Sequence, residues 1–158
     1  MVYKKFDEKI EIRMLKPKDA IKVHKLNRKV WKGDKNIHSL QEIRGRIKSS
    51  GYACFGAFVG GRLVGFTFID SDFKSRKIRL LHTTVDKELQ ERGIASKILK
   101  EVEKYCKRNG KNGIFVFLSN DYKDAIKWAK WVGFVKAGQS KWLYRGDRTA
   151  YIYYKKIA

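Results

Sequence analysis

The stretch Val85-Asp-Lys-Glu-Leu-Gln-Glu-Arg-Gly-Ile-Ala-Ser96 decides the fold of this chain. It follows residues 78–85, whose pattern predicts a β-strand. From Gly93 onward, apolar residues recur at helical spacing as far as Asn109-Gly110, where the glycine ends the pattern. The stretch therefore joins a strand directly to a helix through a short polar loop.

A helix that begins in this way is suited to bind an anion. The first turn of a helix has N–H groups without intrahelical acceptors, and it lies at the positive end of the helix dipole. Arg92 adds a positive charge, while Gly93 and Ala95 lack bulk, so a diphosphate can approach the backbone closely. Small residues are also expected where a loop only has to pack tightly, so both interpretations stay open on this pattern alone.

Periodicity divides the rest of the chain into strands and helices. A hairpin is expected around Gly60-Gly61, because two glycines supply the positive φ angles of a tight turn. The predicted strands cover 9–15, 52–59, 63–69, 78–85, 113–118 and two segments within 135–157 that are joined around 145–148. The predicted helices follow Asp19, cover 38–47, run from 93 to 109, and cover 121–132.

The element order is β-α-α-β-β-β-α-β-α-β-β, which predicts an α/β fold. A chain of 158 residues is about the size of one domain, so residues 1–158 are expected to form a single domain around one mixed sheet of about seven strands with four helices. The strand-helix-strand unit at 78–118 is expected to form a right-handed parallel crossover, because parallel strands joined by a helix are almost always connected with this hand. The hairpins around it are expected to be antiparallel.

The chain is strongly basic, with 37 Lys and Arg against 16 Asp and Glu and a formal net charge of +21. Such a field attracts nucleic acid, anionic membranes and acidic cofactors alike, and it also fits a lysine-rich solvated surface. The charge alone therefore does not choose among these partners.

Cysteine content and hydropathy favour a cytoplasmic protein. Cys54 and Cys106 lie in apolar periodic segments with no Cys or His at ligand spacing, so neither a disulfide framework nor a metal site is expected. No apolar run approaches the length of a membrane span, and no signal peptide or membrane association is predicted.

Gln90-Glu-Arg-Gly-Ile-Ala95 resembles the Arg/Gln-x-x-Gly-x-Gly/Ala signature of the GNAT superfamily of acyl-CoA-dependent N-acetyltransferases, and it is preceded by the family's usual valine, Val85. Downstream, Asn120, Ala125 and Trp131-Val-Gly-Phe134 are similar to the family's helix that ends in Gly-Phe. These motifs span roughly residues 78–134, and the order of elements extends the resemblance over nearly the whole chain. A Rossmann fingerprint is absent.

The resemblance implies a binding cleft for acetyl-CoA between the strands at 78–85 and 114–118. Pantetheine amides are then expected to pair with the backbone near Thr84 and Val85, and Asn120 to contact the cofactor from the second strand. The diphosphate is expected to rest on the loop and the first helical turn. The full set of implied cofactor-binding residues is Thr84, Val85, Gln90, Glu91, Arg92, Gly93, Ile94, Ala95, Ser96 and Asn120.

The chain departs from the family pattern at the residue that protonates the leaving thiolate. The family's tyrosine lies four residues after the helix alanine, and counting from Ala125 that position is Ala129. Tyr122 or water could serve instead, and the sequence gives no basis for choosing. Because a thiolate is a fair leaving group at neutral pH, turnover without this acid is still expected.

His82 is the candidate general base, because an imidazole titrates near neutral pH. Strand alternation puts it on the same face as Thr84 and Leu80, with Thr83 and Val85 on the other. A hydrogen-bonded strand histidine without a catalytic role is the alternative. His24 and His38 fall in helical segments and are expected to be surface or packing residues.

The resulting prediction is a cytoplasmic N-acetyltransferase that transfers an acetyl group from acetyl-CoA directly to a primary amine of a small molecule, peptide or protein N-terminus. An acyl-enzyme on Cys54 or Cys106 is disfavoured, because thiols on apolar faces are inert. A basic nucleic-acid-binding module and a non-catalytic acyl-CoA binder are the alternatives, and nucleic acid or a protein associated with it is a possible partner. The sequence does not distinguish a monomer from a homodimer.

Overall fold

The computed structural model describes residues 9–32, 38–143, 146 and 148–158. Its strands are β1 (Glu11–Met14), β2 (Tyr52–Val59), β3 (Arg62–Lys74), β4 (Lys77–Val85), β5 (Gly113–Ser119), β6 (Val135–Ser140) and β7 (Ala150–Lys156). Its helices are α1 (Ala20–Val30), α2 (Leu40–Lys48), α3 (Ile94–Arg108) and α4 (Lys123–Trp131), with short 3-10 helices η1 (Pro17–Asp19) and η2 (Lys87–Leu89). The predicted order of elements is confirmed.

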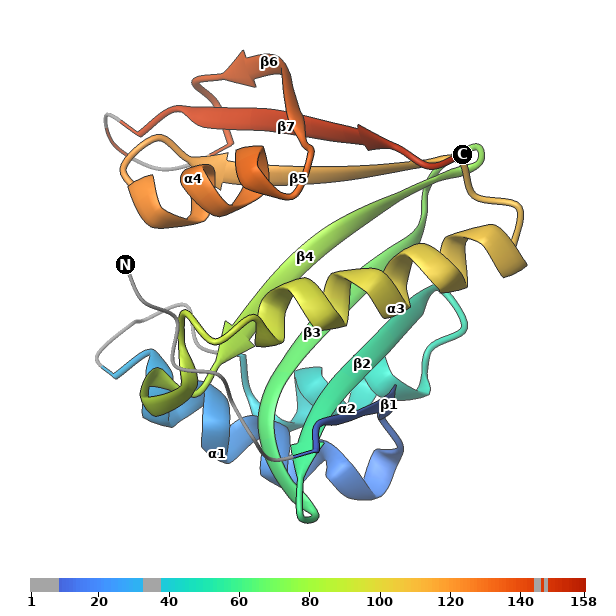
Figure 1. Cartoon of the computed structure of the whole chain (residues 1–158), viewed down its shortest axis with the longest axis vertical. Helices are drawn as coiled ribbons and strands as arrows, with labels where there is room; N and C mark the ends of the chain where they lie inside the picture. Colours follow the sequence, from blue (N-terminus) through green and yellow to red (C-terminus); the bar gives the residue numbers. More distant parts are fainter. Residues whose placement is uncertain (1–8, 33–37, 144–145, 147) are drawn as a thin grey trace.

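One seven-stranded sheet, in the order β1-β2-β3-β4-β5-β7-β6, runs through the molecule (Figure 1). Strands β4 and β5 pair in parallel and are connected through α3, as the crossover predicts, whereas the other neighbouring strands pair antiparallel. Gly60 and Gly61 have φ angles of +55° and +81°, which confirms the tight hairpin between β2 and β3. The predicted α/β fold is therefore correct.

Element boundaries differ from the predictions at several ends. Strand β1 is shorter than the predicted 9–15, and β3 continues to Lys74, well beyond the predicted end at 69. The last helix begins at Lys123 and not at Asp121, because the backbone N–H of Tyr122 donates to Ser119 O at 3.0 Å and closes a turn first. The connection predicted around 145–148 lies partly outside the described residues.

Apolar side chains fill both faces of the sheet. Helices α1 and α2 cover one face, where Val23, Leu26 and Ile43 pack against Phe66 and Phe68. Helix α3 lies across β2, β3 and β4 on the other face (Figure 1). Its buried residues are Ile94, Ile98, Leu99, Val102 and Cys106, which explains the apolar stripe in its sequence.

A β-bulge interrupts β4 immediately before His82. Phe68 pairs with His82 and Ile69 pairs with Leu80, so Leu81 is an extra residue in this strand. Leu80 consequently packs in the α3-side core, whereas Leu81 packs on the α1 side. The expectation that Leu80 shares a face with His82 was wrong, because strict alternation does not hold across a bulge.

The packing of α3 on the sheet predicts the cost of a cavity in this core. Ile98 is fully buried between α3 and the sheet, so Ile98→Ala is expected to lower the free energy of unfolding by about 2–5 kcal/mol. Lys100→Ala removes an exposed side chain from the same helix and is expected to change it by less than about 0.5 kcal/mol. Urea unfolding of both variants tests this, and equal losses would contradict the proposed packing.

Candidate functional site

Strands β4 and β5 separate halfway along their length. They pair only from Lys77 with Gly113 to Leu80 with Val116. Beyond that point β4 stays paired with β3 as far as Val85, and β5 stays paired with β7 as far as Ser119. The edge of β4 that faces β5 is thus without its strand partner between Leu81 and Val85, at the carboxyl end of a parallel pair where ligands bind in open α/β sheets.

The loop after β4 delivers the backbone to the first turn of α3. Glu91 and Gly93 both have left-handed backbone conformations, with φ angles of +65° and +81°. Gly93 is the N-cap of α3 and provides no capping side chain, and a Cβ placed there meets no atom within 4 Å. Since the first intrahelical N–H bond is donated by Lys97 to Gly93 O at 3.0 Å, the amides of Ile94, Ala95 and Ser96 have no intrahelical acceptor. The first turn of α3 therefore presents backbone N–H groups beside a residue without a side chain, which is the geometry that the predicted anion cradle requires.

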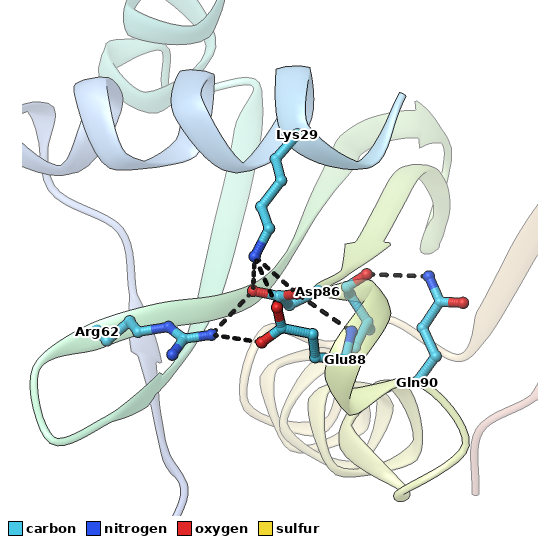
Figure 2. Close-up of polar contacts among 6 residues, drawn as sticks. Lys29, Arg62, Asp86, Glu88 and Gln90 are labelled. Atoms are coloured by element: carbon cyan, nitrogen blue, oxygen red, sulfur yellow. Dashed lines mark hydrogen bonds and ion pairs between the residues drawn. The ribbon is translucent and has the colours of Figure 1, made fainter. Parts of the chain in front are cut away.

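Asp86 anchors this loop through a buried ion cluster (Figure 2). Its carboxylate is 2% exposed and accepts from Lys29 Nζ of α1 at 3.1 and 3.2 Å and from Arg62 Nη2 of β3 at 3.0 Å. It also accepts from the backbone N–H of Glu88 at 3.3 Å, and so caps η2. One carboxylate therefore connects α1, β3 and the start of the loop.

Electrostatics keep this carboxylate ionised. Burial by itself raises the pKa of Asp86, but hydrogen bonds from Lys29, the Glu88 backbone and Arg62 more than offset it, so the pKa lies below its ordinary value. The sequence alone assigns no role to Asp86. The feature that could have indicated a structural role for Asp86 is its position directly after a strand in a chain that has few carboxylates.

Gln90, Thr84 and Val85 lie where the loop and the strand meet. Gln90 Nε2 donates to Val85 O at 3.1 Å, so the side-chain amide of Gln90 holds the loop against the end of β4 (Figure 2). Thr84 directs its hydroxyl to the α1 side, where Trp31 Nε1 donates to it at 3.0 Å. Val85 packs on the α3 side. The side chains of Thr84 and Val85 thus contact the protein interior, and the backbone edge of β4 between Leu81 and Val85 is the part that lacks a strand partner.

Gly65 explains how α3 starts so close to the sheet. A Cβ at this position would lie 3.2 Å from both Thr84 O and Ile94 Cγ2. A side chain here would push the first residue of α3 away from β4. The sequence reading did not identify Gly65, because a single glycine in a strand pattern has several explanations.

His82 lies on the α1 side of β4, within the segment that is separated from β5. Its Nε2 is 2.9 Å from Asn27 Oδ1 and 3.0 Å from Thr84 Oγ1. Because an amide oxygen only accepts, Asn27 favours the tautomer in which Nε2 carries the proton and Nδ1 the lone pair. His38 packs edge-on against His82 with ring centroids 5.5 Å apart, which agrees with the packing role expected for His38.

The α4 side provides no tyrosine at the position where the family pattern has one. Ala129 is fully buried in the core. Trp128, one residue earlier, donates from Nε1 to Ser96 Oγ at 3.2 Å and so joins α4 to the first turn of α3. Tyr122 is 42% exposed at the N-terminus of α4.

Asn120 follows β5 at the opposite side of the strand separation. Its Oδ1 accepts from the backbone N–H of Thr149 at 3.1 Å, and its own N–H donates to Thr149 O at 2.8 Å. These bonds fix the residue next to the start of β7. The side-chain NH₂ group is therefore the part of Asn120 that can donate to a ligand.

Both cysteines are buried, as the sequence predicts. Burial raises the pKa of the Cys54 thiol to about 12 and that of Cys106 to about 11, so both are protonated at neutral pH. Within the described ranges, no group of three or more His, Cys, Asp or Glu side chains is arranged to hold a metal ion. The same residues contain no helix with the length and hydropathy that a bilayer span requires.

Comparison with known families supports what the geometry suggests. The family model described as "Acetyltransferase (GNAT) domain" matches residues 21–141, which is most of the chain. No curated protein sequence matches.

Many solved structures share the fold. The ribosomal-protein-S18-alanine N-acetyltransferase of Escherichia coli is 16% identical, with a TM-score of 0.82 and 95% of each chain covered. The PaiA N-acetyltransferase of Thermoplasma acidophilum in complex with coenzyme A is 22% identical, with a TM-score of 0.79, and the match covers 94% of this chain and 99% of that one. Ard1 from Thermoplasma volcanium is 20% identical, with a TM-score of 0.80 and coverages of 94% and 98%. At these identities the likeness establishes the fold.

The Asp86 cluster predicts a pH-dependent contribution to stability. Asp86→Asn removes the negative charge but keeps the size, and it is expected to lower the free energy of unfolding by about 1–3 kcal/mol at pH 7. Because the folded-state pKa of Asp86 is below its unfolded value of about 3.9, the wild-type advantage should be constant above about pH 5 and should shrink as the pH falls through the folded-state pKa.

Denaturant unfolding of both proteins between pH 3 and pH 7 measures this advantage. A difference that stays constant down to pH 3, or that grows on acidification, would contradict the ion cluster.

Proposed function

Because this chain belongs to the GNAT acetyltransferase family, we propose that it transfers the acetyl group of acetyl-CoA directly to a primary amine of an acceptor molecule. The observation that carries the proposal is the separation of β4 from β5 beside a glycine-capped helix N-terminus. The two features provide a backbone edge for an extended chain of amides and a cationic cradle for its phosphates.

The residues present fit acetyl-CoA as a co-substrate. The unpaired edge of β4 near Thr84 and Val85 can hydrogen-bond pantetheine amides as a neighbouring strand would. The backbone from Glu91 to Ser96 can bind the diphosphate, since Gly93 has no Cβ to obstruct its approach. We propose that Gln90 and Arg92 support this cradle and that Asn120 donates its NH₂ group from across the strand separation.

The chemistry follows from a thioester placed at this separation. Acetyl-CoA supplies a thioester whose carbonyl carbon bonds to the acceptor nitrogen while its C–S bond breaks. His82 accepts the proton that the amine loses, while Asn27 holds its ring in the required tautomer. Ala129 provides no acid, so we propose that water protonates the thiolate. Direct transfer is supported by the raised pKa values of Cys54 and Cys106, which make both thiols poor acyl carriers.

The pKa of the acceptor amine determines how much of it is deprotonated and able to attack the thioester. An α-amine with a pKa near 8 is about one-tenth deprotonated at pH 7, whereas a lysine side chain is deprotonated in only about one molecule in 2,500. Because an α-amine is free often enough to react with little help from a base, we propose an α-amine acceptor, either a small molecule or a protein N-terminus. The E. coli structural neighbour, named for the alanine of a ribosomal protein, belongs to the same acceptor class. We place the reaction in the cytoplasm, where free thiols such as these persist.

Two glycines at the ends of α3 test the cofactor cradle. Gly93 and Gly110 both have positive φ, at +81° and +67°, and a Cβ at either meets no protein atom within 4 Å. Gly93→Ala and Gly110→Ala should therefore lose similar stability, about 1–2 kcal/mol each. Only Gly93→Ala should weaken acetyl-CoA binding, by at least about tenfold, because its methyl group enters the diphosphate seat.

Isothermal titration calorimetry and ligand-induced thermal shifts measure these affinities. Wild-type protein at a hundredfold excess of acetyl-CoA over its dissociation constant should gain about 2.7 kcal/mol. Equal affinities of the two glycine variants for acetyl-CoA would contradict the proposal that the diphosphate binds beside Gly93.

His82 is tested by the pH dependence of turnover. His82→Asn is expected to lower kcat by about 10²–10⁴-fold and to abolish the rise of kcat/KM with pH on the acidic side, since a base acts only when deprotonated. His24 lies in α1 and has no proposed catalytic role, so His24→Asn should change neither kcat nor the pH dependence of kcat/KM. Both variants should bind acetyl-CoA with unchanged affinity. A His82→Asn enzyme that keeps the wild-type pH profile would assign this histidine a purely structural role.

A further inference from the structure

Helix α1 has two contrasting faces. Its buried residues Ala20, Val23, Leu26, Asn27 and Val30 lie against the sheet and α2. Between Ala20 and Lys32 the chain contains five Lys or Arg residues and no Asp or Glu. The polar side of this helix therefore carries positive charge and no negative charge.

Two of these cations are used inside the protein. Lys22 donates from Nζ to Gly61 O at 3.1 Å, and Lys29 binds Asp86. Both reach toward the β2–β3 hairpin and the start of the cofactor loop. Their charges are consequently engaged within the protein, although both side chains are partly exposed.

Four other cations form the α1 cationic stripe, which we define as Lys18 in η1, Lys25, Arg28 and Lys32. All four are exposed, and in the described part of the chain none of them makes a hydrogen bond or a salt bridge. Lys25 and Arg28 lie on the side of α1 opposite its buried face, and Lys18 and Lys32 lie just before and just after this helix.

The cations of α3 differ from this stripe because carboxylates lie among them. Lys104 is 3.1 Å from Glu101, and Lys155 of β7 pairs with Glu103. Lysines of α3 thus contribute a weaker net field than their number indicates. No residue of the α1 cationic stripe forms an ion pair with a carboxylate in the described part of the chain.

The side chains around the stripe indicate which kind of anionic partner fits it. The apolar face of α1 is buried in the core, so this helix cannot insert that face into a bilayer or into the groove of a partner protein. Ile21, at 47% exposure, is the exposed large apolar side chain beside the stripe, and Trp31 is held by Thr84. No aromatic platform for unpaired bases accompanies the charges in the described part of α1.

We propose that the α1 cationic stripe is a docking surface for the phosphate backbone of double-helical nucleic acid. Exposed cations along one side of α1 complement a row of phosphates, and without groups that reach base edges the binding is independent of sequence. The net charge of +21 adds long-range attraction to this contact. The proposal goes beyond acetyl transfer and does not depend on it.

The test compares two proteins from which the same number of charges has been removed. One carries Lys18→Gln, Lys25→Gln, Arg28→Gln and Lys32→Gln, and the other carries Lys100→Gln, Lys104→Gln, Lys107→Gln and Arg108→Gln on α3. Fluorescence anisotropy with a labelled 20-base-pair duplex, measured between about 50 and 200 mM salt, gives the affinity and its salt dependence. Thermal unfolding checks that each variant is folded.

The α1 variant should lose at least about tenfold in affinity, and the slope of log K against log salt should fall by about 3–4, since each neutralised phosphate contributes about 0.9. The α3 variant should lose less than about threefold. A third protein with Lys18→Arg, Lys25→Arg and Lys32→Arg keeps the charges and should bind as the wild type does, which separates charge from helix stability.

Three results would overturn the proposal. The first is wild-type binding that is absent or insensitive to salt. The second is an equal loss in the α1 and α3 variants, which assigns binding to net charge alone. The third is competition by poly-glutamate of equal charge that is as effective as competition by unlabelled duplex, which assigns the stripe to acidic proteins.

Discussion

A parallel strand pair that ends after four residue pairs leaves backbone groups on both strands without their sheet partner. These groups need compensation, because an unpaired backbone N–H or C=O is costly unless water or a ligand binds it. The rest of the structure keeps the two strands apart: β3 holds β4, β7 holds β5, and the bulge at Leu81 redirects the side chains that follow. The proposed cofactor site exists because the sheet is complete on either side of the separation and incomplete within it.

The loop that leaves this separation is held by charge in a chain that is short of carboxylates. Asp86 is buried with Lys29 and Arg62, and these partners come from α1 and β3. The side chains of Lys29 and Arg62 are partly exposed and also lie near the exposed carboxylate of Glu88, whereas the carboxylate of Asp86 between them is buried. The cluster thus fixes the loop at its first residue, and the positive φ of Glu91 and Gly93 sets its direction at the end.

The sequence predicted the features that are local and missed those that depend on distant contacts. The hairpin at Gly60-Gly61, the parallel crossover and the strand-to-helix junction at Gly93 all follow from spacing and turn chemistry. The bulge at Leu81 could not be found, because periodicity assumes alternation and the extra residue is defined only by the pairing of β3. The partners of Asp86 lie 57 and 24 positions away along the chain, so no local pattern relates them to it. The contact between Trp128 and Ser96 could not be predicted either, because these residues are also distant in the sequence.

Helix α1 relates the two proposed activities to each other. Its inner face positions His82 through Asn27 and Thr84 through Trp31, and its outer face carries the α1 cationic stripe. Lys29, between the two faces, binds the carboxylate that anchors the cofactor loop. A duplex bound to the outer face would contact a helix whose inner face is fixed by buried hydrogen bonds, so docking need not alter the catalytic geometry. Docking would instead act on the effective concentration of the acceptor. Acceptors associated with nucleic acid would be held on the same molecule as the strand separation, without any added contact in the active site.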